Sequence, residues 1–439
     1  MSLFHHAVAA QRPAFFGPWV VRATFVMACF GWGVGFYGPP VFLHAVLQRT
    51  GWPLTWVSIA VTLHYLFGAL LVTRLPRLHR RFGVGPTAVA GAAAVTLGML
   101  GWSMATAPWQ LLASALLSSG WVAMGAVAVN AAIAPWYVRQ RPMALAKAYN
   151  GASVGGVLFS PLWVLLIAQW GFTAAAGCVG LVMLAVMAML ARLVFRQSPG
   201  HLGQWPDGDA AAAAPAAGAG ARHAAALPGR QLWRNRRFRT LALGMAAGLF
   251  AQIGLLAHLF SLLVPLLGAQ AAGLAMGFAT ACAIGGRLLV ARLLPPGADR
   301  RLAAALGYAV QLAGTALLMT AAELHPAWTL LGLALFGSGL GNATSLPPLI
   351  AQAEFAPADV PRVVALIVAM AQAAYAFAPA VLGLALSAWH AQAQGPGPGP
   401  GPGPGPGQGA MDGTAAFFLT AAATQLLAIA CFLAGRRPA

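Results

Sequence analysis

Few residues of this chain could do chemistry, because only 7% of its 439 residues are charged. Arg287 is the most informative, since it lies inside the apolar stretch near residues 270–294. If that stretch is a helix ending near Pro295, a rise of about 1.5 Å per residue places Arg287 roughly 12 Å from the helix end. A guanidinium that deep in hydrocarbon costs roughly 2.5–3.5 kcal/mol. Paired hydrogen bonds to a carboxylate would offset that cost, whereas the alternative is a side chain that snorkels to the interface.

Titratable groups inside the apolar stretches are equally scarce. All seven acidic residues fall in polar segments or at the ends of apolar ones: Asp207, Asp209, Asp299, Glu323, Glu354, Asp359 and Asp412. No carboxylate is therefore expected at depth to carry a proton. His258 and His64 do lie within apolar stretches, and histidine titrates near neutral pH, so both are candidates for proton coupling. The alternative interpretation is that each is a hydrogen-bonded structural residue.

Neutral polar side chains complete the candidate binding set. With Arg287, they are Tyr37, Asn130, Asn342, Gln372 and Tyr375. For the two asparagines, hydrogen bonding between helices without any substrate is an equally good interpretation. The cysteines have no metal-type spacing and no glycine-rich loop ends in Gly-Lys-Ser/Thr, so neither a metal, another cofactor nor an ATP motor is expected.

The elements that position these residues are long and apolar. Hydrophobic residues make up 60% of the chain, which leaves too little charge to cover a soluble protein of this size. Stretches of about 18 or more apolar residues are typical of membrane-spanning helices. They lie near residues 20–43, 54–73, 84–106, 110–134, 144–168, 172–194, 240–264, 270–294, 302–322, 327–350, 361–389 and 413–434. The sequence predicts an all-α integral membrane protein of about 12 transmembrane helices.

The net charge of +18 would indicate nucleic-acid binding if it formed a patch on a soluble domain. Instead, almost every Arg falls in alternate loops. With both termini in the cytoplasm, Arg49 alone among the 25 basic residues lies outside, and Arg287 alone lies well inside a helix. This asymmetry is what the positive-inside rule predicts. We expect a multi-pass protein that contacts anionic lipid headgroups on the cytoplasmic side and binds no nucleic acid.

The chain divides into two similar halves. Residues 1–195 and 240–439 each hold six apolar stretches, and residues 196–239 form a polar linker expected in the cytoplasm. A Gly-Pro repeat at residues 395–407 interrupts the second half, and no function is assigned to it. The run Gly-Ala-Leu-Leu-Val-Thr-Arg-Leu at 68–75 recurs as Gly-Arg-Leu-Leu-Val-Ala-Arg-Leu at 286–293, with an offset of 218 residues. Two related bundles that rock about a central site are the physical basis of alternating access.

Three stretches carry a resemblance to a known family. They are residues 30–38 (Phe-Gly-Trp-Gly-Val-Gly-Phe-Tyr-Gly), residues 135–144 (Pro-Trp-Tyr-Val-Arg-Gln-Arg-Pro-Met-Ala) with the glycine-rich run at 150–156, and Gly-Gly-Arg at 285–287. The chain resembles the major facilitator superfamily, and within it the bacterial members similar to monocarboxylate transporters and oxalate/formate antiporters. The resemblance implies that Arg287 binds a substrate carboxylate and that His258 matches a helix in which relatives often carry histidine.

The loop between the second and third stretches departs from the family pattern. Superfamily members usually read Gly-x-Leu-x-Asp-Arg-x-Gly there, whereas this chain has Pro76 for the glycine and Arg80 for the aspartate. That aspartate normally joins a charge network which holds one gate closed. The candidate gating loop is therefore formed by Arg77, Arg80 and Arg81.

These observations predict a monomeric secondary transporter of the bacterial inner membrane. The oxalate-type antiporters pair their arginine with a lysine, where this chain offers Gln372 and Tyr375. One buried cation balances one carboxylate, so a monocarboxylate is favoured, carried by proton symport or by anion exchange. The alternatives are export of drugs or other hydrophobic compounds, a polytopic membrane enzyme, and a transporter-like receptor. No set of catalytic residues is evident, so an enzyme is not expected.

Overall fold

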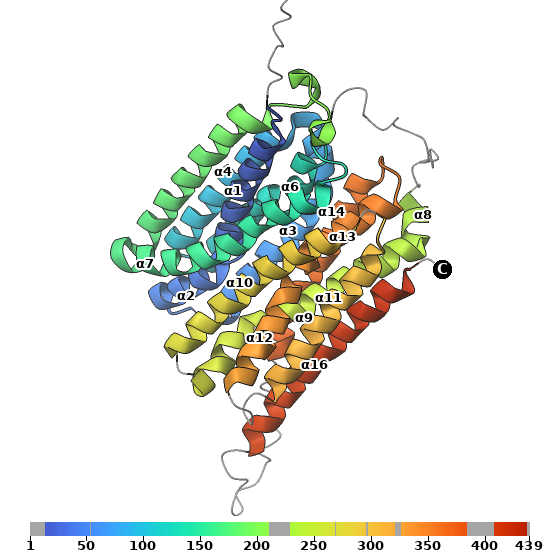
Figure 1. Cartoon of the computed structure of the whole chain (residues 1–439). Helices are drawn as coiled ribbons and strands as arrows, with labels where there is room; N and C mark the ends of the chain where they lie inside the picture. The colour runs from blue at the N-terminus through green and yellow to red at the C-terminus, as the bar shows by residue number, and fades with distance from the viewer. Residues whose placement is uncertain are drawn as a thin grey trace, which may run out of the picture.

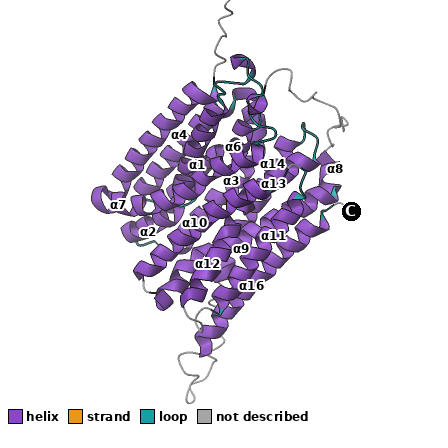
Figure 2. Ribbon diagram, in the orientation of Figure 1, coloured by secondary structure: helices purple, strands orange, loops and turns teal. Residues whose placement is uncertain are grey.

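The computed structural model describes residues 14–52, 54–209, 229–267, 269–295, 297–320, 326–383 and 408–436. Within these ranges every regular element is helical (Figures 1 and 2). The Gly-Pro repeat at residues 395–407 lies outside them. The predicted all-α fold is confirmed.

The N-terminal half contains six spans. Its helices are α1 (Gly17–Gly35), α2 (Gly38–Thr50), α3 (Leu54–Phe82), α4 (Val84–Met104), α5 (Pro108–Ser118), α6 (Ala126–Ile133) and α7 (Arg141–Leu190). The first span bends between α1 and α2, because two prolines at the start of α2 lack the N–H groups that would continue α1. A 3-10 helix (Ser119–Met124) breaks the fourth span between α5 and α6. At Gly171 (φ 76°) the chain turns back, so α7 supplies both the fifth and the sixth spans (Figure 1).

The C-terminal half repeats this plan. After the short α8 (Gly229–Arg234) come α9 (Arg236–Leu267), α10 (Ala269–Leu293), α11 (Arg300–Met319), α12 (Pro326–Leu340), α13 (Asn342–Glu354), α14 (Val360–Tyr375) and α16 (Gln408–Ala434). Ten helical segments of the described chain are long and apolar enough to cross a membrane. One of them is the double-span α7, and α12 with α13 forms a further span broken at Gly341. With α7 counted as two spans and α12–α13 as one more, the described chain has the total of about twelve membrane spans that the sequence predicts.

Glycines allow the helices of each bundle to approach closely. A Cβ on Gly151 or Gly155 of α7 would lie 2.0 or 2.3 Å from a carbonyl oxygen of α1. A Cβ on Gly286 of α10 or Gly337 of α12 would meet a carbonyl oxygen of the other helix at 2.1 or 2.4 Å. Small residues are the usual means of close helix packing in lipid, where apolar burial alone does not drive association. These contacts fix the rotation of the helices that carry the candidate site.

The outer surface of the bundles is apolar. Leu70, Leu97, Leu181, Leu274 and Leu293 are each 59–72% exposed, and they come from both halves. A contiguous apolar surface of this extent would drive aggregation in water, whereas lipid tails cover it at no cost. The protein is a multi-pass membrane protein.

One end of the molecule, which we call the basic end, carries most of the charge. Its exposed arginines are Arg74, Arg77, Arg80, Arg81, Arg139, Arg230, Arg234, Arg236, Arg239 and Arg362. The start of α1, the residues that follow α7 and the end of α16 lie at this same end (Figure 1). The two bundles meet mainly where α3 packs against α14 and α7 against α10.

Candidate functional site

Arg287 lies between the two bundles and is 4% exposed. Its Nε donates a hydrogen bond of 2.7 Å to the carbonyl oxygen of Gly341, at the break between α12 and α13. Its Nη1 donates a second bond of 2.7 Å to Oδ1 of Asn150, which belongs to α7 of the opposite bundle. The guanidinium is therefore enclosed by protein and does not snorkel to the interface.

The Arg287 guanidinium has N–H groups that make no hydrogen bond to a described residue. Of its five N–H groups, those on Nη2 make no hydrogen bond to a described residue, because the bonds of Arg287 are the two from Nε and Nη1. Beside it lies a crevice of about 10 Å³, whose lining includes Pro142, Asn342 and Ser345. That volume suits roughly one water molecule. The open cavity implied by a central carboxylate site is thus closed in this conformation.

A chain of polar side chains runs from the neighbourhood of Arg287 toward the basic end. Asn130 of α6 donates through Nδ2 to the Tyr149 hydroxyl at 2.7 Å. Gln352 of α13 donates to Asn130 Oδ1 at 3.4 Å and accepts from Arg141 Nη1 at 3.2 Å. Asn130 and Arg141 belong to the N-terminal bundle and Gln352 to the C-terminal one. These two bonds therefore tie the bundles together at the basic end.

Arg141 also braces the loop from which it emerges. Its Nε donates to the Tyr137 carbonyl at 2.6 Å and its Nη2 to the Ala134 carbonyl at 2.8 Å. All three guanidinium nitrogens of Arg141 thus donate hydrogen bonds. The two bonds to carbonyl groups fix the orientation in which Arg141 contacts Gln352. In the sequence, Arg141 indicates only membrane orientation and the family resemblance, because no local pattern shows which carbonyl groups its side chain contacts.

Asp207 supports the same loop from the segment that follows α7. Its carboxylate accepts hydrogen bonds of 2.8–3.3 Å from the backbone N–H groups of Val138, Arg139 and Gln140. Its φ of 60° is unusual for a residue other than glycine, although aspartate tolerates it better than most. These bonds satisfy the N–H group of the N-cap residue of α7, Gln140, and those of the two residues before it. The first part of the segment between the bundles is therefore folded onto the N-terminal bundle.

Gln372 and Tyr375 of α14 form a third contact between the bundles. Gln372 donates through Nε2 to the carbonyl oxygen of Tyr65 on α3 at 2.9 Å. The Tyr375 ring lies 5.8 Å from the ring of Tyr65 and 5.9 Å from that of Phe36. Tyr37 directly follows Phe36 in the sequence, and it lies close enough to Arg287 to interact with its charge. The structure thus brings the predicted Tyr37, Gln372 and Tyr375 to the interface that holds Arg287.

Asn342 lines the crevice beside Arg287 but makes weak bonds. Its Nδ2 lies 3.5 Å from the carbonyl oxygens of Gly286 and Ser338, both within its own bundle. Asn130 in the N-terminal half and Asn342 in the C-terminal half both lie at broken spans, yet of the two only Asn130 takes part in the contact between bundles among the described residues.

The two candidate histidines lie in separate bundles, and neither bonds to Arg287. His64 is fully buried, with Nδ1 2.8 Å from the Ser118 hydroxyl and Nε2 donating to the Gly35 carbonyl at 2.8 Å. His258 is partly exposed and donates through Nε2 to the Pro379 carbonyl at 2.9 Å. Both ring nitrogens of His64 are therefore occupied, whereas Nδ1 of His258 has no partner among the described residues.

The candidate gating loop of the N-terminal half forms no charge network with the part of the chain that the structure describes. Arg77, Arg80 and Arg81 are exposed, and none forms an ion pair with a described residue. Arg81 instead lies over the ring of Phe82, 5.1 Å from its centroid. The missing aspartate is thus not replaced locally.

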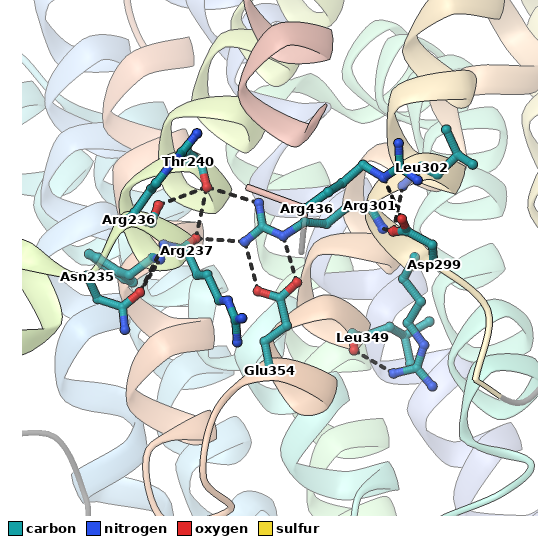
Figure 3. Close-up of polar contacts among 12 residues, drawn as sticks. Asn235, Arg236, Arg237, Thr240, Asp299, Arg301, Leu302, Leu349, Glu354 and Arg436 are labelled. Carbon is teal, nitrogen blue, oxygen red and sulfur yellow. Dashed lines mark hydrogen bonds and ion pairs between the residues drawn. The ribbon is translucent and has the colours of Figure 1, made fainter. Parts of the chain in front are cut away.

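The charge network occurs in the C-terminal half (Figure 3). Arg301, only 2% exposed, donates to both carboxylate oxygens of Glu354 at 2.6 and 2.8 Å, and it also bonds to Thr240 and the Arg237 carbonyl. These contacts clamp α9, α11 and α13 together. The repeat offset of 218 residues relates Arg81 to Asp299, so the same offset could have revealed this second loop from the sequence.

Asp299 caps α11 and pairs with the end of α16. Its Oδ1 accepts from the backbone N–H groups of Arg301 and Leu302, both at 3.0 Å, and its Oδ2 pairs with Arg436. Partial burial raises the pKa of this carboxyl. The hydrogen bonds from Leu302 and Arg436, with the Arg436 charge, outweigh that effect and hold the pKa below its ordinary value.

Glu354→Gln is expected to destabilise the protein by about 1.5–3 kcal/mol, because buried Arg301 would lose its charged partner. Thermal unfolding in detergent measures this. Asp209→Asn is the matched control, since its partner Arg139 is 59% exposed and such surface pairs contribute little. Equal melting temperatures for Glu354→Gln and the control would contradict the clamp.

No group of three or more His, Cys, Asp or Glu side chains is placed to hold a metal within the described ranges. The site is instead one deep cation with several amide and phenol side chains at the contact of two bundles. The fold and the site together indicate the class of protein: a multi-pass helical membrane protein with two repeated six-helix halves and polar side chains between them.

Comparisons with known proteins agree with this class. Residues 23–379 match the family model of the Major Facilitator Superfamily, and the chain belongs to that superfamily. It is 29% identical over 161 residues to the MFS transporter asaE of Aspergillus flavus, a match that spans 35% of each protein. A crystal structure of a variant of the Escherichia coli fucose:proton symporter FucP superposes with a TM-score of 0.61 at 14% identity, covering 93% of this chain and 98% of FucP. That likeness shows the shared fold.

Proposed function

We propose that this superfamily member is a secondary active transporter of a small organic anion, most favourably a monocarboxylate. The observation that carries the proposal is Arg287, a cation buried at the contact of the two bundles with unused donors on Nη2. A planar carboxylate can accept two parallel hydrogen bonds from a guanidinium. A single positive charge at this depth favours a guest of a single negative charge.

In the closed conformation, Asn150 Oδ1 accepts the hydrogen bond that we expect a substrate carboxylate to accept. Its Oδ1 lies 2.7 Å from Nη1, a position that a carboxylate oxygen could take. An anion would replace a neutral acceptor with a charged one, and charge-assisted hydrogen bonds are roughly twice as strong. Binding at Arg287 would therefore release the tie to Asn150 and favour separation of α7 from α10.

The remaining ties between the bundles are weak enough to break in each transport cycle. Arg141–Gln352, Gln352–Asn130 and Gln372–Tyr65 are hydrogen bonds with at least one neutral partner. Each contributes about 0.5–3 kcal/mol, the upper value applying to charged donors. A substrate that binds one conformation more tightly by a few kcal/mol can shift such an equilibrium.

Proton symport and anion exchange are both compatible with this site. For symport we favour His258 over His64, because Nδ1 of His258 can accept a proton without losing a bond to a described residue. FucP is a fucose:proton symporter, and its similar fold supports symport as the mode of coupling. The basic end is proposed to face the cytoplasm of a bacterial cell, against anionic lipid headgroups, with the transporter acting as a monomer.

Export of hydrophobic compounds is the second candidate, and the aromatic residues at the interface favour it. Phe36, Tyr65 and Tyr375 form mutual ring contacts of 5.8–6.0 Å, and such faces stack well on apolar guests. In this reading Arg287 would serve only to join the bundles.

A panel of small carboxylates, sugars and hydrophobic cations, scored by thermal stabilisation of the purified protein, distinguishes the two. Binding to the folded state at 100 times the dissociation constant adds about 2.7 kcal/mol of stability. We expect one or more monocarboxylates to raise the melting temperature, and dicarboxylates of similar size to do so less. Stabilisation by hydrophobic cations alone would overturn the carboxylate assignment.

A further inference from the structure

The crevice beside Arg287 extends toward the basic end of the molecule. Its lining includes Arg287 of α10 and Leu294, which follows that helix, and Asn342 and Leu349 of α13. The members of each pair are seven residues apart, which corresponds to about 10 Å along a helix. Pro142, at the start of α7, lines the crevice from the opposite bundle. We call the end formed by Pro142, Leu294 and Leu349 the crevice mouth.

Two arginines lie at the crevice mouth, one from each bundle. Arg300, the first residue of α11, donates through Nη1 to the Leu349 carbonyl oxygen at 2.7 Å. Arg141, directly before Pro142, donates through Nη1 to Gln352 Oε1 at 3.2 Å. Leu349 and Gln352 are three residues apart, so both bonds fall within one turn of α13. The two guanidinium groups are close enough for their charges to repel each other.

The Arg300 guanidinium has donors that are free to bind an anion. Its bond to a described residue comes from Nη1, so the edge formed by Nε and Nη2 is unused within the described ranges. This edge of a guanidinium can donate to both oxygens of one carboxylate. Arg300 is also partly buried, in contrast to the exposed arginines of the basic end.

The described carboxylates leave this positive charge unbalanced. Neither Arg141 nor Arg300 forms an ion pair with an acidic residue in the part of the chain that the structure describes. Asp207 does act on the charge of Arg141, but its carboxylate accepts hydrogen bonds from three backbone N–H groups. An anion between the two arginines would therefore offset their repulsion.

We propose that Arg300, with Arg141 opposite it, binds the substrate carboxylate at the crevice mouth on its way to or from Arg287. The inference rests on the transport function proposed above and adds a second anion site to it. A cationic mouth raises the local concentration of an anionic substrate. Partial exposure keeps the bound anion in contact with water and weakens the attraction, so the site can release the anion again.

The walls between the two sites explain why a second cation is useful. The residues that line the crevice between Arg287 and the mouth are mainly apolar: Ala146, Val290, Ala291 and Leu346. A carboxylate that moves along them has few hydrogen-bond donors, and an unpaired charge in apolar surroundings is costly. A guanidinium at each end, about 10 Å apart along the helices, limits that cost to a short step once the bundles separate.

Arg300→Gln tests the mouth site in proteoliposomes whose basic end faces the added monocarboxylate. We expect KM to rise about five- to tenfold and the maximal rate to stay within about twofold of wild type, because a partly exposed charged contact is weaker than a buried one. Arg300→Lys keeps the charge without the paired donors and should give an intermediate KM. The difference in KM between wild type and Arg300→Gln should shrink as KCl rises from about 0.05 to 0.3 M, because salt screens exposed charges.

Arg239→Gln is the matched control. It removes one positive charge from an exposed position of the basic end, away from the lining of the crevice. Equal KM values for Arg300→Gln and this control would overturn the mouth site. If Arg300→Gln does not fold, as judged by thermal unfolding in detergent, Arg300→Lys decides instead, and a wild-type KM for that variant overturns the site.

The lipid composition of the vesicles separates the substrate from a lipid headgroup. We expect the effect of Arg300→Gln to persist in vesicles of phosphatidylcholine alone. An effect that appears only with an anionic phospholipid would assign Arg300 to the headgroup and overturn the proposal.

Failure of the mouth site differs from failure of the transport function. Absence of carboxylate uptake by the wild-type protein would overturn both. Wild-type uptake that is lost in Arg287→Gln but keeps its KM in Arg300→Gln would retain the central site and exclude the mouth site.

Discussion

Arg287→Gln is expected to lower uptake of the monocarboxylate identified by the ligand panel by at least about 30-fold. Loss of one partner from a buried charged pair costs about 2–5 kcal/mol, and each 1.4 kcal/mol is tenfold in affinity. Glutamine can still donate a hydrogen bond, so the change removes the charge and the fork while largely keeping the packing. Arg287→Lys retains the charge but not the paired donors, and we expect an intermediate loss.

Initial uptake into proteoliposomes measures both variants. Arg292→Gln is the control, because Arg292 lies on the same helix, in its last turn, and is exposed. Thermal unfolding without ligand shows whether the variants remain folded. If Arg287→Gln transported the substrate at the wild-type rate, the guanidinium would have no part in binding, and the role of Arg287 would be confined to joining the bundles.

Gln352→Leu is expected to open the basic end. The substitution removes the bonds to Arg141 and Asn130 together, and leaves the Arg141 guanidinium without its partner in the opposite bundle. Taken together, a bond to a charged donor and a neutral one contribute about 2–4 kcal/mol. The equilibrium between the closed and open conformations should therefore shift by roughly 30–700-fold toward the open one.

Hydrogen–deuterium exchange of the backbone amides measures this shift toward the open conformation. We expect faster exchange in residues 126–141 and 348–356, and unchanged exchange near Gly171 at the opposite end. Gln140→Leu is the control, since the Gln140 side chain is exposed and makes no hydrogen bond to a described residue. Exchange in Gln352→Leu that matches this control would show that other contacts hold the basic end closed.

The sequence predicted the spans well because their signal is local. Each depends on the length of an apolar run and on the position of arginines between runs, which no distant contact changes. The turn at Gly171 likewise falls between the predicted stretches 144–168 and 172–194. The break before Pro39 was not predicted, because it lies inside the stretch 20–43, although the prolines explain it. The depth of Arg287 could be counted along its helix, because it too depends only on the local sequence.

The partners of those residues could not be predicted. Asn150 is 137 residues from Arg287 in the chain, and Gln352 is 211 residues from Arg141. In a helix with apolar residues on every side, periodicity does not reveal which face meets another helix. The sequence could therefore not distinguish His64, whose ring is fully bonded, from His258, whose Nδ1 is not.

By itself, then, the sequence determined how often this chain crosses the membrane, which loops are basic, and that one cation lies deep. The tertiary structure decided that this cation bonds across the two bundles, and that the charge network lies at Arg301 and Glu354. The physical reason is that hydropathy and charge act residue by residue. Helix rotation and register, in contrast, are set by close contacts such as Gly151 against α1 and Gly286 against α12, which join distant parts of the chain.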